Sequence, residues 1–200
     1  MRAVGLMGPL ILFLSLAALA SGCGGYGAVA PEGADTVSVA LTGTVPGADS
    51  ILARLYLYRI KSRKTHKRLG IGRSFTIREG RQVRAVLEME GLDGDEHLLI
   101  HIMWINPDGR RAYTKEVHIL PGDWDSEEKV QQLRKMRVRL DRARHLLEVE
   151  SRYGVDPVKF EEEMDKPPEK RTFKPGRWEV RVYLFRKLLL ATSFDLAEED

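Results

Sequence analysis

The sequence predicts a mainly β protein, an antiparallel β-sandwich of about seven or eight strands with a helical insertion. Apolar and polar residues alternate in many short runs, and clusters of Gly, Pro, Asn and Asp separate these runs. One longer segment instead repeats its apolar residues every three or four positions. The chain has 200 residues, 43% hydrophobic and 30% charged, which is enough for one core and excludes a disordered chain.

The alternating runs define the expected strands. Successive side chains of a strand point to opposite faces, so Leu55 and Leu57 should share one face while Tyr56 and Tyr58 share the other. The turn residues Asn-Pro-Asp-Gly at 106–109 predict a hairpin, and residues 176–196 predict another. Strands are predicted over residues 36–41, 51–60, 75–77, 83–89, 96–105, 111–120, 178–184 and 188–196.

Residues 125–165 interrupt this pattern and predict the helical insertion. Asp125 followed by Glu128 is typical of a helix start, and Gly154 of a helix end. A second short helix is expected over residues 156–164. Residues 136–140 also alternate, so a strand there is the alternative. The apolar stripe of the first helix consists of Val130, Leu133, Met136, Leu140, Ala143 and Leu147.

Residues 1–22 have the composition of an export signal. Arg2 and the amino terminus give a positive start, and a nearly continuous apolar stretch leads to small residues before Cys23. An uncleaved membrane helix is one alternative, which Pro9 and the glycines after Cys23 disfavour. A plain secretory signal is the other. Residues 23–35 then predict a flexible tether to a folded domain over residues 36–200.

The segment Leu19-Ala20-Ser21-Gly22-Cys23 resembles the lipobox of bacterial lipoproteins. The chain's single cysteine stands where that pattern requires it, although Ala20 replaces the leucine that the family prefers. The resemblance implies that residues 1–22 are removed and that Cys23 becomes an acylated, palmitate-bearing N-terminus. Multiple acyl chains are needed for stable anchoring, which lipoproteins supply. Because Gly24 follows Cys23, the enteric sorting rule implies the outer membrane, with the protein facing the periplasm.

Residues 91–109 and 176–196 are similar to parts of Ig-like or fibronectin-like domains of bacterial envelope proteins. The strand that begins Pro175-Gly176-Arg177-Trp178 carries most of this resemblance. It implies an Ig-like sandwich. With one cysteine the chain lacks the disulfide of antibody domains, and a shared fold does not define an activity.

Basic residues gather in two places. One run over residues 61–68 is expected to be a loop between strands, and the other lies on the predicted helix. The helical group either is a solvated face or contacts anionic lipid headgroups or an acidic partner. Because the chain is expected to be exported and its formal net charge is only +3, we expect no nucleic-acid partner. The candidate interaction surface comprises Arg134, Lys135, Arg137, Arg139, Arg142, Arg144, Lys64, Lys67 and Arg68.

Motifs for catalysis, cofactors and metals are weak. His97 and His101 lie on a predicted strand, where four residues span about 13 Å, too far for one shared ion. Residues 70–74 lack the third glycine of a phosphate-binding loop and are expected to form a bend. Residues 161–163 are three glutamates on a predicted surface helix. We therefore expect no enzyme activity, no metal and no cofactor.

The sequence as a whole predicts a lipid-anchored envelope protein that acts as a non-catalytic binding or structural module through protein contacts. One alternative is an accessory subunit of an envelope secretion, assembly or transport complex. The other is a sandwich that binds glycans or small ligands. Trp124, which follows Pro121-Gly122 in a predicted loop, would be the aromatic platform for such a ligand.

Overall fold

The structure, a computed structural model, describes residues 34–39, 51–77, 82–154 and 160–198. Strands dominate the described part of the chain, and its helices are short. In chain order, the elements are β1 (Asp35–Val39), β2 (Ile51–Tyr58), β3 (Ile60–Lys61), β4 (Arg68–Leu69), β5 (Ser74–Thr76), β6 (Gln82–Glu90), β7 (Leu98–Ile105), β8 (Arg111–Ile119), η1 (Asp123–Asp125), α1 (Glu127–Lys135), β9 (Val138–Asp141), η2 (Arg142–Arg144), β10 (Leu146–Gly154), α2 (Phe160–Met164), η4 (Pro168–Lys170), β11 (Gly176–Leu184) and β12 (Lys187–Ala197).

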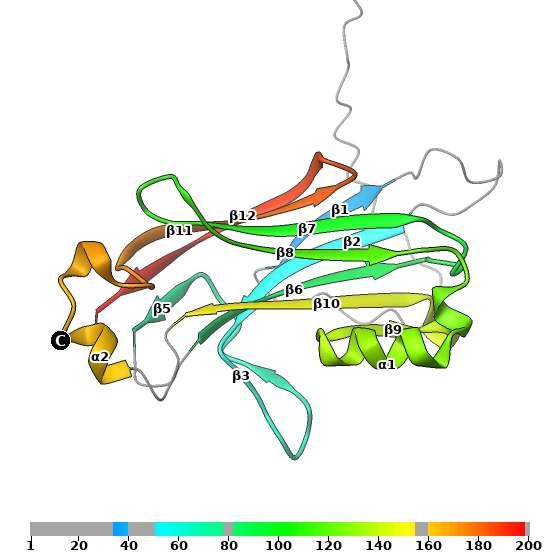
Figure 1. Cartoon of the computed structure of the whole chain (residues 1–200), viewed down its shortest axis with the longest axis horizontal. Helices are drawn as coiled ribbons and strands as arrows, with labels where there is room; N and C mark the ends of the chain where they lie inside the picture. The colour runs from blue at the N-terminus through cyan, green and yellow to red at the C-terminus, as the bar shows by residue number, and fades with distance from the viewer. Residues whose placement is uncertain (1–33, 40–50, 78–81, 155–159, 199–200) are drawn as a thin grey trace, which may run out of the picture.

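Two five-stranded sheets form the body of the molecule and confirm the predicted β-sandwich (Figure 1). The first sheet has the order β1-β2-β6-β10-β9, and the second has the order β5-β12-β11-β7-β8. Neighbouring strands are antiparallel, except that β12 and β5 run parallel. The small β3–β4 hairpin is separate and projects from the sandwich (Figure 1).

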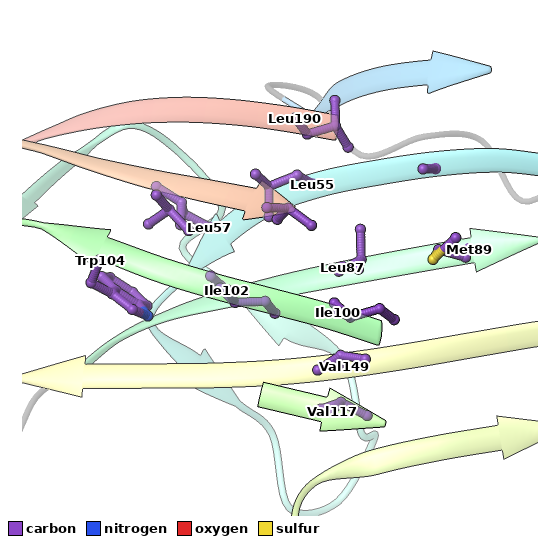
Figure 2. Packing of buried hydrophobic residues seen from close by; sticks show 14 of the residues in the cluster. Leu55, Leu57, Leu87, Met89, Ile100, Ile102, Trp104, Val117, Val149 and Leu190 are labelled. Carbon is purple, nitrogen blue, oxygen red and sulfur yellow. The ribbon is translucent and has the colours of Figure 1, made fainter. Parts of the chain in front are cut away.

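The core lies between the two sheets, whose inward side chains meet in one apolar layer (Figure 2). In the first sheet the register aligns Leu55, Leu87 and Val149, all fully buried, across β2, β6 and β10. In the second sheet Ile102 lies opposite Val182. Burying a side chain of this size contributes about 1.5–3 kcal/mol, so these rows hold the two sheets together.

The predicted strands are confirmed, with boundaries shifted by a few residues. The turn at 106–109 joins β7 to β8, as expected, and residues 176–196 form the β11–β12 hairpin. Phe185 and Arg186 form the two-residue turn of that hairpin with φ of 47° and 67°. Such left-handed pairs match the twist of the flanking strands. Residues 40 and 41 of the first predicted strand lie outside the described residues.

The helix predicted after Asp125 is much shorter than its apolar stripe indicated. The helix α1 ends at Lys135, Arg137 has a left-handed φ of 63°, and the chain continues into β9 and β10. The alternative strand at 136–140 is therefore correct. Sheet pairing prevails because Val138 and Val149 lie opposite each other and are buried in the core. The insertion is thus largely part of the first sheet, and more strands are present than predicted.

The ends of the helical segments also differ in detail. The N-cap of α1 is Ser126, whose Oγ accepts a hydrogen bond from the Lys129 backbone N–H at 3.3 Å. Asp125 instead ends the short turn η1. Gly154 ends β10 and not a helix. The second predicted helix appears as α2 and ends at Met164, while residues 155–159 lie outside the described part.

Candidate interaction surface

The outer face of the first sheet carries an ionic layer beneath the β3–β4 hairpin. Tyr56 and Tyr58 point outward from β2, opposite the inward Leu55 and Leu57, yet both tyrosines are buried. Tyr56 Oη donates to Glu88 Oε1 at 2.5 Å, and Tyr58 Oη donates to Glu150 Oε2 at 2.6 Å. We call this set the ionic layer; its members are Arg54, Tyr56, Tyr58, Arg68, Arg84, Glu88, Glu90, Arg137, Arg139, Glu148 and Glu150.

Arg68 on β4 fastens the hairpin to this layer. Its guanidinium pairs with Glu88 at 2.7 Å and with Glu148, and it lies 5.4 Å from the ring centre of Tyr56 and 5.8 Å from that of Tyr58. Burial by itself lowers the pKa of Arg68, but Tyr56 and the two glutamates reverse this, and the net pKa is raised. Arg68 therefore stays charged and holds two strands of the sheet to the hairpin.

Glu150 is the second centre of the ionic layer. It accepts from Tyr58 and pairs with Arg84 at 3.3 Å and with Arg137 at 3.1 Å. Burial raises the pKa of Glu150, but the hydrogen bond from Tyr58 and the two arginines lower it below its usual value. Burial, followed by the hydrogen bond to Glu88, raises the pKa of Tyr56. Each charge in the layer thus has an opposite charge beside it, which suits a structural role.

The hairpin itself also carries cations that, unlike those of the ionic layer, are exposed and have no described partner. The side chains of Lys61, Arg63, Lys64 and Lys67 are exposed, and none has an acidic or hydrogen-bonding partner within the described residues. The turn is nevertheless ordered by its backbone. Ser62 N–H donates to Lys67 O at 2.8 Å, and His66 N–H donates to Ser62 O at 3.0 Å.

The structure separates the predicted interaction residues into three groups. Arg68, Arg137 and Arg139 belong to the ionic layer, and Arg139 also pairs with Asp141 at 2.6 Å. Arg142 pairs with Asp125, and Arg144 lies 3.9 Å from Asp141. Exposed cations without a described partner are Lys64 and Lys67 on the hairpin and Arg134 and Lys135 at the end of α1.

The single helical face predicted for the arginines is therefore wrong. Only Arg134 and Lys135 lie on α1, while Arg137 follows it and Arg139 is on β9. Arg142 and Arg144 lie on η2. These basic residues were assigned to one helix face because the segment's apolar stripe predicted a helix. In the strand β9, however, alternate residues lie on opposite faces, and Arg139 faces Glu148 on β10.

Trp124 is not an exposed platform, which corrects the sequence prediction. It lies in η1 and is only 8% exposed, within the core cluster. Gly94, at φ +98°, packs so closely that a Cβ there would lie 3.3 Å from the Trp124 ring. The large apolar area of the indole accounts for its burial, even in a short turn between β8 and α1.

The two histidines singled out in the sequence do not meet each other. His97 Nε2 lies 2.6 Å from His118 Nε2, whereas His101 Nε2 lies 2.9 Å from Glu116 Oε2. His101 is on β7, as expected, and His97 immediately precedes that strand. Within the described residues, no group of three or more His, Cys, Asp or Glu side chains is arranged to hold a metal ion.

The other segments with candidate chemistry have structural positions. Residues 70–74 form a bend, with Gly70 at φ +68°, that leads into β5. Glu161 and Glu162 on α2 are exposed, but Glu163 is 9% exposed and accepts from the Thr172 backbone N–H at 2.8 Å. Cys23 lies outside the described residues. Among the described helices, none is both long and apolar enough to cross a bilayer.

The sequence interpretation missed the acidic half of the ionic layer. Glu88 and Glu90 on β6, and Glu148 and Glu150 on β10, stand two residues apart and therefore on one face of their strands. Together with Tyr56 and Tyr58 at the same spacing, this pattern was the available signal. It was obscured on β10 because that segment was assigned to a helix.

Comparisons with known proteins identify no family for this chain. No family model matches the chain, and no curated protein matches it. A crystal structure of an immunoglobulin-like protein from Pseudomonas aeruginosa is similar, with a TM-score of 0.38 and 13% identity over 71% of this chain and 90% of that chain. So distant a likeness carries no argument about function, and the β-sandwich is established by the two sheets themselves.

Proposed function

We propose that this chain is a bacterial envelope lipoprotein anchored through Cys23, and that its Ig-like sandwich is a non-catalytic module acting through surface contacts with an envelope protein. The observation that carries the proposal is the position of the single cysteine. Cys23 follows an apolar leader with small residues before it, and the first described residue of the folded domain is Ala34. An unpaired thiol in an exported protein has a clear chemical role if it is acylated.

The character of the sandwich supports the non-catalytic part of the proposal. The half-buried charged groups at the two centres of the ionic layer, Arg68 and Glu150, contact opposite charges that keep them in their ordinary charged states. A general acid or base instead requires a pKa near the working pH and access to a substrate. The charged groups of the ionic layer pair with one another, so a partner would bind other surfaces of the sandwich.

In-cell crosslinking of the tagged full chain, followed by separation of membrane and soluble fractions, tests this function. We expect the wild-type chain in the membrane fraction, crosslinked to one envelope protein at constant stoichiometry. The Cys23→Ser variant should lose both membrane retention and this crosslink. Wild-type protein found mainly in the soluble fraction, or crosslinked only to scattered abundant proteins, would contradict the proposal. Co-migration with one large assembly would identify the partner as a multi-subunit complex.

A further inference from the structure

The position where the folded domain begins is close to the base of the β3–β4 hairpin. Ala34 packs against Tyr56 and Tyr58 together with Ile71, which follows the hairpin. Asp35 then pairs with Arg73 at 2.5 Å. Ala34 therefore lies on the outer face of the first sheet, the face to which Arg68 fastens the hairpin.

The tether is short enough to keep this face near an anchor at Cys23. Residues 24–33 lie between Cys23 and the first described residue, and this segment is rich in glycine. The eleven residue steps from Cys23 to Ala34 can span no more than about 36–40 Å, even when fully extended. A lipid at Cys23 would thus place the hairpin close to the bilayer surface, a setting that rests on the proposed anchoring.

The hairpin and its flanks have an unbalanced positive charge. Residues 59–77 contain no Asp or Glu. Two of the cations, Arg68 and Arg73, are engaged with carboxylates on the sandwich, and Arg59 contacts Phe75 and donates to Thr76 O. The remaining cations are exposed and without a described partner; they are Lys61, Arg63, Lys64 and Lys67.

The hairpin presents these cations on a fixed support with an apolar base. Ile60 and Leu69 lie opposite each other in the register and are 42% and 51% exposed. Arg68, between Lys67 and Leu69, is held by Glu88 and Glu148. A cationic tip beside exposed aliphatic side chains, on a support fixed to the sheet, suits the boundary between headgroups and acyl chains of a bilayer.

We infer that the β3–β4 hairpin binds the anionic headgroup surface of the membrane in which the chain is anchored. The narrow hairpin offers charge and two apolar side chains. These features are enough for binding an anionic bilayer, whose lipids can move to meet the charges. Binding a specific acidic protein would instead require a large surface of complementary shape. The hairpin would orient the sandwich on the membrane and leave its opposite side free for a partner.

Vesicle co-sedimentation of unlipidated residues 23–200 carrying Cys23→Ser tests this inference. This chain contains every described element, and its binding does not depend on acylation. The vesicles contain phosphatidylcholine alone or phosphatidylcholine with phosphatidylglycerol. Two triple variants remove the same charge, one Arg and two Lys, from the hairpin or from distant exposed sites. They are Arg63→Gln/Lys64→Gln/Lys67→Gln and the matched control Lys170→Gln/Arg186→Gln/Lys187→Gln.

The unmodified chain should bind the anionic vesicles, bind neutral vesicles only weakly, and dissociate as salt is raised. Since each cation near the surface contributes about fivefold, the hairpin variant should bind about 100-fold more weakly. The control variant should bind within a few-fold of the unmodified chain. Failure to bind anionic vesicles, equal binding to neutral ones, or equal loss in both variants would overturn the inference. Because Cys23 is absent here, this failure is distinguishable from a failure of lipidation.

Discussion

Replacing Arg68 by methionine should destabilise the sandwich strongly, although Arg68 lies outside the apolar core. Its side chain is 18% exposed and lies between Glu88 and Glu148, which are 15% and 12% exposed. Methionine keeps much of the aliphatic volume over Tyr56 and Tyr58 but removes the positive charge. Two poorly solvated carboxylates then face each other without the cation that both contact.

The size of the effect follows from this burial. Removing one partner of a fully buried ion pair costs about 3–5 kcal/mol. Arg139 remains beside Glu148, and both carboxylates retain some solvent contact, so we expect a loss of about 2–4 kcal/mol. For a domain of this size that loss corresponds to a fall in Tm of roughly 5–15 °C.

Urea denaturation followed by tryptophan fluorescence measures this loss. The variants Arg68→Met, Glu148→Gln and their combination form a double-mutant cycle, in which we expect a coupling free energy of about 1–3 kcal/mol. The control is Arg142→Met, which breaks a pair with Asp125 whose side chains are 55% and 63% exposed. That change should cost less than about 1 kcal/mol. Equal losses for Arg68→Met and Arg142→Met would refute the argument that Arg68 fastens the hairpin.

Three further predictions concern single residues. Gly94→Ala should cost about 2–3 kcal/mol because its left-handed backbone abuts Trp124, whereas Gly109→Ala, equally left-handed but in open space, should cost about 1 kcal/mol. Ser151→Ala should lower the free energy of unfolding by about 1–3 kcal/mol, because the buried Oγ of Ser151 accepts a hydrogen bond from the buried indole N–H of Trp104 at 2.9 Å. Burial lowers the pKa of Lys115 to about 8. Between pH 8 and 10 the free energy of unfolding should therefore rise with pH. The Lys115→Met variant should show a rise that is smaller by about 1 kcal/mol.

Between pH 8 and 10 the unfolded chain carries the Lys115 proton more often than the folded chain, so deprotonation favours folding. Burial raises the pKa values of Tyr56, Tyr58 and Tyr153, so stability should fall again above pH 10. Denaturation series across pH test this. If Lys115→Met leaves the slope of the unfolding free energy against pH unchanged, the argument for Lys115 is wrong. Equal losses of stability in Gly94→Ala and Gly109→Ala would contradict the argument for Gly94. A Ser151→Ala variant as stable as the unmodified chain would contradict the argument for Ser151.

The sandwich was predictable where one face of a strand is apolar and turn residues follow it. Leu98, Ile100, Ile102 and Trp104 alternate without interruption, and the turn after Ile105 fixed the β7–β8 hairpin. The same alternation of apolar and polar residues also predicted the strands β11 and β12. In these elements local preference and tertiary packing favour the same structure.

The β9–β10 region could not be predicted in the same way because two periodicities compete there. Leu133, Leu140 and Leu147 fit a helix, while Val138 and Val149 fit strands that pair with each other. The choice depends on β6, which is distant in sequence and borders β10. The ionic layer depended on that choice, since Glu148 and Glu150 reach Arg68 and Tyr58 only from a strand.

The burial of Trp124 had a similar cause. Its position after a proline and a glycine indicated a loop, which η1 confirms in part. Nothing local showed that this turn packs its indole against Gly94 and the core. A large aromatic side chain in a short connection is a candidate for the core as well as for a ligand platform.

The most direct test of lipid anchoring, the central claim, is the intact mass of the protein purified from the membrane fraction of its native host. We predict a chain that begins at Cys23, lacks residues 1–22, and carries the added mass of several acyl groups on its N-terminal peptide. The Cys23→Ser variant should show no acyl mass at all. An unacylated chain that begins at another residue, or that retains residues 1–22, would contradict the account.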